Sequence, residues 1–148
     1  MKFKKVVFVS KDGTYRAPLA ATILRKLAGN GLEVSARGFV VLFPEPINPK
    51  GIAVAVSKGI NVKETISEEL KENDFDAETL VLVMTEKIKQ QIYDKFKTAV
   101  NVYSLKEFGE GQGDIDTPFG KSINEYLENY DLMEEWVNKA YKKLKELK

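Results

Sequence analysis

The chain has 148 residues, of which 43% are hydrophobic and 30% charged, and its 23 basic and 22 acidic side chains leave a formal net charge of +1. This composition is typical of a folded protein with a core of its own, and the balanced charge excludes a general attraction to nucleic acid or to an anionic membrane. The sequence contains neither cysteine nor histidine, which excludes disulfides, cysteine nucleophiles and histidine general bases.

We expect one domain over residues 1–148, because no linker, repeat or low-complexity tract divides the chain. The apolar run at residues 6–9 is too short for a signal peptide, and no stretch approaches the roughly 18 apolar residues of a membrane span. We interpret the chain as a cytoplasmic protein without a metal or cofactor and without a nucleic-acid or membrane partner. Its oligomeric state stays open.

The first three elements alternate between strand and helix. An apolar run at residues 5–9 predicts a buried strand, and the pattern PLAATILRKLAG predicts a helix at residues 18–29. A second apolar run, at residues 32–39, predicts the next strand. Near-continuous apolar runs of this kind are typical of parallel strands that are covered on both faces.

Two further helices are predicted before the third strand. Asn48, as a cap, and Pro49, in the first turn, predict a helix that runs to Gly59. Thr65 and Glu68 have the spacing of a capping box, which predicts a short helix over the segment TISEEL.

The second half of the chain repeats the alternation. Strands are predicted at residues 79–84 and 100–105, and a helix with one apolar face is predicted between them at 85–96. Ser122 and Glu125 form a second capping-box pattern, which starts a long amphipathic helix at the end of the chain.

Alternating strands and helices predict an α/β fold: one three-layer domain with a parallel sheet and helices on both faces. In such sheets ligands bind beyond the carboxyl ends of the strands, where the strand order reverses. The loop after the first strand is therefore the candidate binding site.

This loop runs from Ser10 to Ala17 and has the parts of an anion site. Backbone N–H groups that lead into a helix N-terminus bind anions, and Arg16 adds a bidentate donor for phosphate oxygens. Gly13 tolerates a positive φ. The Asp12 carboxylate opposes phosphate binding if it points into the loop. The alternative interpretation is a plain strand-to-helix turn that carries a surface arginine.

The loop sequence resembles that of the low-molecular-weight protein tyrosine phosphatases, which reads Cys-x-Gly-Asn-x-Cys-Arg-Ser-Pro. The resemblance continues through SARG, PEPINPKGIAVAVSKGI, LVLVMTEK and DIDTPFGKSINEY, so it covers essentially the whole chain in order. It implies the phosphatase-I-like Rossmannoid fold, a four-stranded parallel sheet in the order 2-1-3-4 with helices on both faces.

The resemblance also assigns a role to each position of the site. Ser10 stands where the family has its cysteine nucleophile, and Arg16 is the retained phosphate-binding arginine. Ala17 replaces the hydroxyl that stabilises the thiolate. Thr117 stands at the position of the acid, and Asp116 lies one residue earlier. The phosphate-binding loop implied by the match comprises Lys11, Asp12, Gly13, Thr14, Tyr15, Arg16 and Ala17.

We therefore predict a phosphatase-like protein that keeps an anion-binding loop and has lost most turnover, in other words a pseudophosphatase. A serine is a weak nucleophile unless a base activates it, and acid–base help is typically worth about 10²–10⁴-fold in rate. We interpret Ser10 as a natural substitution rather than an engineered one, because Gly13, Tyr15, Ala17 and Thr117 also depart from the family pattern.

Two alternatives remain. The first is an active phosphatase, a hydrolase for phosphotyrosine or phosphoarginine, in which Ser10 replaces a native cysteine or Asp116 acts as a displaced acid. Thr14 and the pair Pro118-Phe119 resemble the bacterial phosphoarginine phosphatases.

The second alternative is an interaction protein that has lost the pocket. In that case Asp12 and Tyr15 fill the loop, and exposed aromatic side chains are the candidate contacts with a partner. These side chains are Phe43, Phe108 and Phe119.

Overall fold

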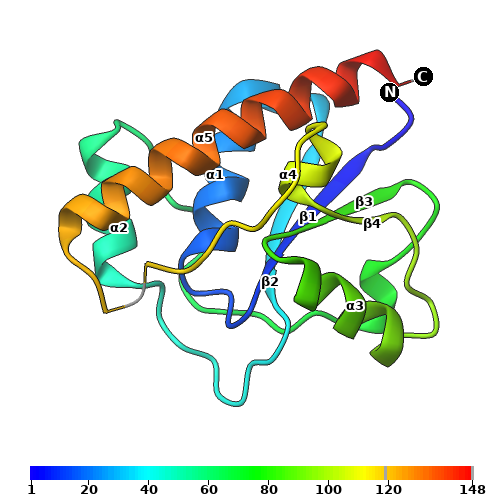
Figure 1. Cartoon of the computed structure of the whole chain (residues 1–148), viewed down its shortest axis with the longest axis horizontal. Coiled ribbons are helices and arrows are strands. Elements are labelled where there is room, and N and C mark those ends of the chain that lie inside the picture. The colour runs from blue at the N-terminus through cyan, green and yellow to red at the C-terminus, as the bar shows by residue number, and fades with distance from the viewer. Residues whose placement is uncertain (119, 148) are drawn as a thin grey trace.

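The computed structural model describes residues 1–118 and 120–147. Its sheet has four parallel strands in the order β2-β1-β3-β4, as predicted (Figure 1). In chain order the strands are β1 (Lys5–Ser10), β2 (Glu33–Gly38), β3 (Thr79–Val83) and β4 (Val102–Ser104).

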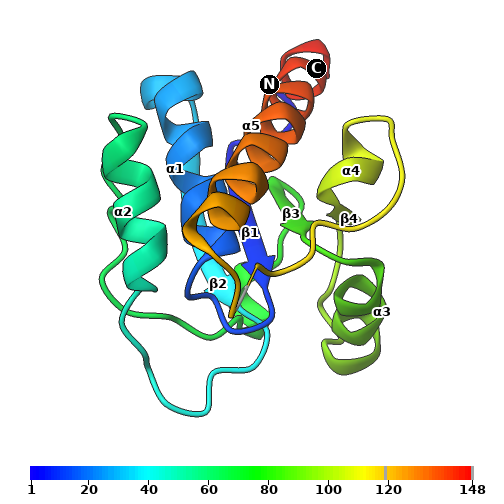
Figure 2. The same ribbon diagram turned by 60° about the vertical axis from the view of Figure 1, so that its left-hand side comes forward.

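Helices cover both faces of this sheet (Figure 2). The helices α1, α2, α4 and α5 pack on one side, and α3 packs on the other. Among the described residues, no helix is both long enough and apolar enough to cross a membrane. The helices are α1 (Arg16–Ala28), α2 (Pro49–Ser57), α3 (Glu86–Lys95), α4 (Leu105–Phe108) and α5 (Ile123–Glu146), with 3-10 turns at Gly29–Gly31 and Glu72–Asp74.

The central strand β1 divides the core into two halves. Val6 and Phe8 face the half that is shared with α1, α2, α4 and α5. Val7 and Val9 face the other half, which is shared with α3. All four side chains are completely buried, because a strand directs successive side chains to opposite faces and both faces are covered. The near-continuous apolar run of β1 thus has its physical explanation.

Two of the predicted helix starts, at Asn48 and Ser122, are confirmed. The side chain of Asn48 accepts a hydrogen bond from the amide of Lys50, with Pro49 in the first turn of α2. The hydroxyl of Ser122 likewise accepts from the amide of Glu125 at the start of α5. These caps satisfy amides that lack a partner within the helix.

The predicted short helix over TISEEL is wrong, because this segment is extended. An antiparallel bridge joins Pro46 to Ile66, and a parallel bridge joins Gly38 to Glu69. Leu70 is buried in the half of the core that α3 covers. So short a segment gains few helical hydrogen bonds of its own, and backbone pairing with two other segments determines its conformation instead.

Two glycines bring the loop after β1 against the end of β2. Gly13 has a φ of +73°, and a Cβ atom there would lie 2.8 Å from the amide nitrogen of Gly38. A Cβ atom at Gly38 would lie 2.6 Å from the carbonyl oxygen of Asp12. Neither position has room for a side chain, so the path of the loop is fixed by backbone contact.

We expect the Gly38→Ala variant to lose about 1–3 kcal/mol of free energy of unfolding, the usual cost of overpacking. The matched control is Gly31→Ala, where the nearest heavy atom to a new Cβ is Cε of Met1 at 3.8 Å. The control is expected to stay within about 0.5 kcal/mol of the parent chain. Urea unfolding measures both, and equal stability of the two variants would contradict the close approach.

Candidate active site

The loop between β1 and α1 lies at the carboxyl edge of the sheet, where the sequence predicts a ligand. Backbone hydrogen bonds hold it at three points, one of which is the bond of 3.0 Å from the amide of Val40 to the carbonyl of Lys11. The amide of Phe39 donates to the carbonyl of Ser10, and the amide of Asn48 donates to the carbonyl of Thr14, each at 2.9 Å. The loop is therefore tied to the segment between β2 and α2.

Ser10, predicted to stand at the position of the family's nucleophile, is completely buried at the base of the loop. Its Oγ accepts a hydrogen bond of 3.3 Å from the amide of Ala17. That amide belongs to the first turn of α1, for which Tyr15 supplies no side-chain cap. The amino-terminal end of the helix thus meets the Ser10 hydroxyl, and a helix N-terminus favours negative charge.

Arg16 is the buried cation of the site, with 7% of its surface exposed. Its Nη1 donates a hydrogen bond of 2.7 Å to the carbonyl of Ile115, and the amide of Ile115 donates to the carbonyl of Met84 at 2.8 Å. Burial lowers the pKa of Arg16, and the negative charge of Asp12 partly opposes this effect. The side chain keeps its positive charge, because an arginine is not deprotonated in proteins.

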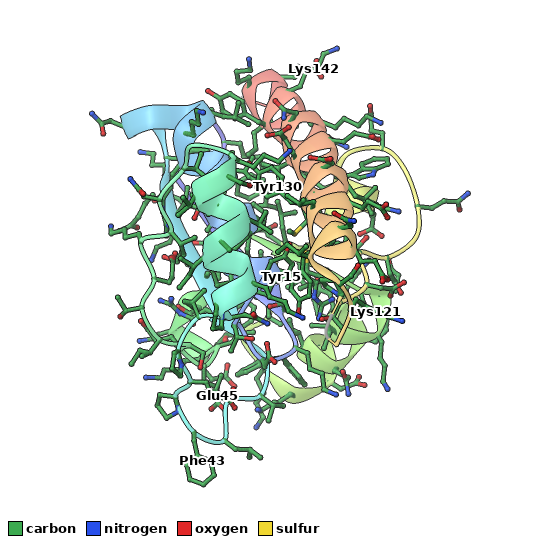
Figure 3. The ribbon with its side chains drawn as sticks, turned by 90° about the vertical axis from the view of Figure 1, so that its left-hand side faces the viewer. Tyr15, Phe43, Glu45, Lys121, Tyr130 and Lys142 are labelled. Atoms are coloured by element: carbon green, nitrogen blue, oxygen red, sulfur yellow. The ribbon has the colours of Figure 1, made fainter. Side chains whose placement is uncertain are left out.

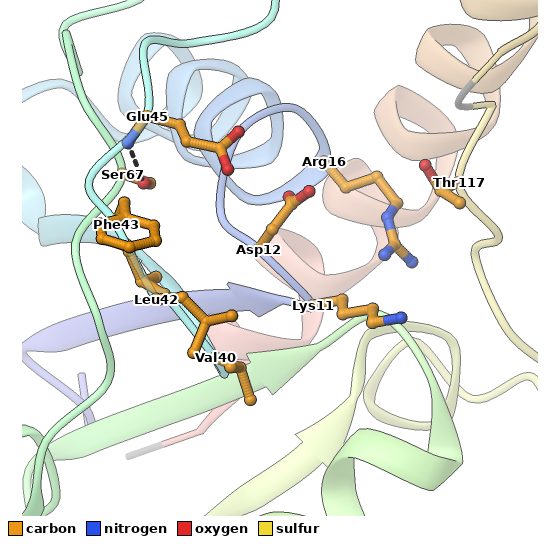
Figure 4. A pocket seen from close by; sticks show the side chains of 10 residues that line it. Lys11, Asp12, Arg16, Val40, Leu42, Phe43, Glu45, Ser67 and Thr117 are labelled. Atoms are coloured by element: carbon orange, nitrogen blue, oxygen red, sulfur yellow. Dashed lines mark hydrogen bonds between the residues drawn. The ribbon is translucent and has the colours of Figure 1, made fainter.

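Arg16 lines two neighbouring hollows, with volumes of about 430 and 440 Å³. Both are also lined by Lys11, Val40 and Thr117, as Figure 4 shows for the first. The first hollow is further lined by Asp12, Val41, Leu42, Phe43, Glu45 and Ser67, and the second by Phe39, Thr85, Lys87, Ile88, Gln91 and Asp116. Gly13, Thr14, Tyr15 and Ala17 are buried in the loop itself.

The Asp12 carboxylate points back onto the loop. Its Oδ1 accepts hydrogen bonds from the amide of Thr14 at 3.0 Å and from the Thr14 hydroxyl at 2.9 Å. The Asp12 carboxylate therefore already accepts the hydrogen bond of one loop amide that the sequence analysis assigns to an incoming anion.

Tyr15 does not fill the loop, contrary to one of the alternatives considered above. Its hydroxyl donates a hydrogen bond of 3.0 Å to the carbonyl of Tyr126, and the two rings meet edge to face at 4.8 Å. The side-chain amide of Asn48 donates to the Tyr126 hydroxyl at 3.2 Å. Tyr15 therefore anchors the loop to α5, and burial raises its pKa well above the usual range.

Asp116 and Thr117 are brought to the site, as predicted. Both are exposed, and both line the second hollow together with Arg16. The carbonyl of Asp116 accepts a hydrogen bond of 2.8 Å from the side-chain amide of Asn129 on α5. The carboxylate of Asp114 accepts from the amide of Glu86 at 2.9 Å, so the segment is held at both α3 and α5.

The three aromatic side chains that the sequence predicts to be exposed do not all lie on the surface. Phe43 is 78% exposed at the tip of the loop between β2 and α2 (Figure 3). Phe108 is buried instead, with 4% exposure, because α4 packs its apolar side against α5. Phe119 lies outside the described residues.

The sequence gives no signal for two parts of the site. Glu45 lines the first hollow, and the Ile115 carbonyl holds Arg16. Both lie in segments that carry the family resemblance, PEPINPKGIAVAVSKGI and DIDTPFGKSINEY, but the resemblance assigns neither residue a role and no local pattern points to one. Among the described residues, no group of three or more acidic, cysteine or histidine side chains is placed to hold a metal ion.

The family described as "Low molecular weight phosphotyrosine protein phosphatase" matches residues 5–148. The chain belongs to this family. The protein-arginine-phosphatase of Bacillus subtilis strain 168 is 33% identical to it over 146 residues, which cover 95% of the chain and 96% of that protein. The low molecular weight protein-tyrosine-phosphatase PtpB of Staphylococcus haemolyticus is 27% identical over 127 residues, 86% of the chain and 90% of that protein.

Solved structures of this phosphatase family share the fold. A mutant of the YwlE arginine phosphatase with serine in place of cysteine, and with its active-site serine phosphorylated, matches with a TM-score of 0.88 at 30% identity and 95% coverage of both chains. The family resemblance and the sheet order that it implies are therefore confirmed.

We expect the Tyr15→Phe variant to change how stability depends on pH. The folded chain holds Tyr15 protonated, whereas an unfolded chain ionises it above an ordinary pKa of about 10. The stabilisation is therefore complete below pH about 10 and is lost as the pH rises toward the raised pKa. Burial raises the pKa of Tyr130 to about 12. Tyr130 therefore also lowers stability at alkaline pH, equally in the parent chain and in Tyr15→Phe.

Urea unfolding at pH 8 and at pH 11 measures this effect. Tyr15→Phe should cost about 1 kcal/mol at pH 8, where the hydrogen bond to Tyr126 is lost, and should lose less stability than the parent between the two values. The control is Tyr103→Phe, which removes a hydroxyl that is on the surface. If the parent and Tyr15→Phe lose the same free energy of unfolding between pH 8 and pH 11, the role of Tyr15 is contradicted.

Proposed function

We propose that this chain binds the phosphoryl group of a phosphorylated protein side chain in the loop from Ser10 to Ala17 without hydrolysing it efficiently. The observation that supports this most is Arg16, a buried guanidinium that lines both hollows and is held in place by the Ile115 carbonyl. Burying a cation costs free energy, and an anionic ligand would offset that cost. Lys11 adds a second cation to both hollows.

The proposed loss of turnover follows from two substitutions. A thiolate both attacks phosphorus and leaves again readily, whereas a serine hydroxyl does neither well without a base. Thr117 cannot donate a proton as a carboxylic acid does, and Asp116 precedes the position at which the family places its acid. Binding depends on Arg16 and the loop amides, which do not need either group.

We take the proposed ligand class from the activities for which the relatives are named. They are named for phosphatase activity on protein tyrosine and protein arginine, and both residues carry their phosphoryl group at the end of a long side chain. The hollows beside Arg16 are large enough to admit such a side chain along Val40.

We expect Arg16→Ala to weaken the binding of phenyl phosphate by about 10-fold or more, the cost of losing hydrogen bonds from a charged donor. Chemical-shift titration of the labelled chain measures the affinity. Lys142→Ala, on the exposed face of α5, is the matched control and should leave binding unchanged. The proposal fails if millimolar phenyl phosphate does not shift the spectrum of the parent chain, or if Arg16→Ala binds equally well.

A second candidate function is phosphoryl capture at Ser10. The related YwlE mutant carries a phosphorylated active-site serine. In this chain Ser10 stands where the resemblance places the family's nucleophile, and its Oγ lies against the helix N-terminus. In the step that we propose, Oγ forms a bond to phosphorus while the bond from phosphorus to the leaving group breaks. The hydroxyl proton passes to the leaving group, through water or Asp116. The phosphoserine then persists, because an alkoxide is a poorer leaving group than a thiolate.

Incubation with an aryl phosphate tests capture and turnover together. We expect at most one phenol released per chain, with the phosphoryl group found on the peptide that contains Ser10 by mass spectrometry. Ser10→Ala should release none, and Ser10→Cys should show whether a cysteine alone restores turnover. Release of many phenol molecules per chain by the parent protein would contradict the loss of turnover, and an unmodified Ser10 would contradict capture.

A further inference from the structure

The first hollow beside Arg16 contains charges of both signs. Lys11 and Arg16 line it together with Asp12 and Glu45. Figure 4 shows the carboxylates of Asp12 and Glu45 extending toward the same part of the hollow, with the charged groups of Lys11 and Arg16 at its other side. A site for a simple dianion needs the two cations only, so the two carboxylates call for an explanation.

Asp12 is placed where a bound anion would compete with it. Its Oδ1 accepts hydrogen bonds from both the amide and the hydroxyl of Thr14, and Asp12 exerts the largest favourable electrostatic influence on Arg16. An incoming phosphoryl group therefore meets an amide that is already occupied and a negative charge next to its own position. Like charges in one hollow repel each other, and water screens part of this repulsion because Asp12 is exposed.

Two hydrogen bonds with Ser67 hold the backbone of Glu45 in place. Its amide donates a hydrogen bond of 2.9 Å to the hydroxyl of Ser67, and its carbonyl accepts one of 2.8 Å from the amide of Ser67. Within the described residues, no hydrogen bond or ion pair engages the Glu45 carboxylate itself. This carboxylate is thus available to a ligand on the side of the hollow opposite to the cations.

We propose that Asp12 and Glu45 determine specificity: the hollow selects phosphoryl ligands that carry a cationic group next to the phosphoryl group, and discriminates against simple phosphate dianions. The proposal rests on the proposed function, because Arg16 must bind the phosphoryl group. The cationic group of the ligand pairs with the carboxylates, and a ligand without one leaves two negative charges facing its own. Asp12 therefore competes with the phosphoryl group for the loop amide. A ligand that carries a cationic group beside its phosphoryl group displaces Asp12 at little cost, because the cationic group then pairs with the carboxylate.

Two ligands of nearly equal size test this. Ethyl phosphate and O-phosphoethanolamine differ by one ammonium group, and chemical-shift titration of the labelled protein gives the affinity for each. We expect the parent chain to bind O-phosphoethanolamine about 3- to 10-fold more tightly, the range of one or two partly exposed charge pairs. Asp12→Asn and Glu45→Gln should each tighten ethyl phosphate binding and reduce the preference, and the double variant should bind both ligands alike.

Both variants keep the shape of the side chain, and the amide oxygen that Asp12→Asn introduces can still accept from the Thr14 amide, so the loop is expected to fold in each. The control Glu128→Gln removes a carboxylate on the exposed face of α5 and should leave both affinities unchanged. Equal binding of the two ligands by the parent chain, or an unchanged preference in the double variant, overturns the specificity role. If Arg16→Ala still weakens both ligands in that case, the proposed function stands. Absence of binding by the parent and every variant overturns both.

Discussion

The buried position of β1 in the middle of the sheet is the constraint on which the site depends. This strand pairs with β2 on one side and β3 on the other, and helices cover both of its faces. It cannot shift without breaking hydrogen bonds on two edges and packing on two faces. The loop that follows begins from a fixed point, and the contact between Gly13 and Gly38 leaves its backbone one path. Ser10 and Arg16 are therefore positioned by the sheet rather than by their neighbours in the loop.

Binding and turnover depend on different parts of such a site. In the function that we propose, Arg16 and the amides at the start of α1 bind an anion through charge and hydrogen bonds, whatever group stands at residue 10. Turnover needs in addition a nucleophile that leaves again and an acid that protonates the departing group. A chain that has substituted Ser10 and Thr117 within the family pattern can lose the second property and keep the first. The hydrogen bond from the Tyr15 hydroxyl to the Tyr126 carbonyl anchors the loop without involving either substituted position.

The net charge of +1 means that no long-range field draws an anion to this protein. Selectivity must come from groups within a few ångströms of the ligand. Lys11, Arg16, Asp12 and Glu45 are such groups, since they line one hollow. Arg16 is buried, so its charge acts more strongly than it would on the open surface, whereas Lys11, Asp12 and Glu45 are exposed and water screens part of their charge. The arrangement of charge in the hollow, rather than its sum, is what a ligand encounters.

Elements with local signals could be predicted from the sequence: the apolar runs of β1 and β3, the caps of α2 and α5, and the loop that ends in Arg16. Hydrophobic periodicity and capping act over a few residues, so the sequence expresses them directly. Contacts between distant segments were needed to make TISEEL extended, to bury Phe108 and to turn Tyr15 away from the loop toward Tyr126. The same kind of contact brings Glu45 and the Ile115 carbonyl into the site. These features arise from pairing and packing between segments far apart in the chain, whose free energy outweighs the weak local preference of any one of them.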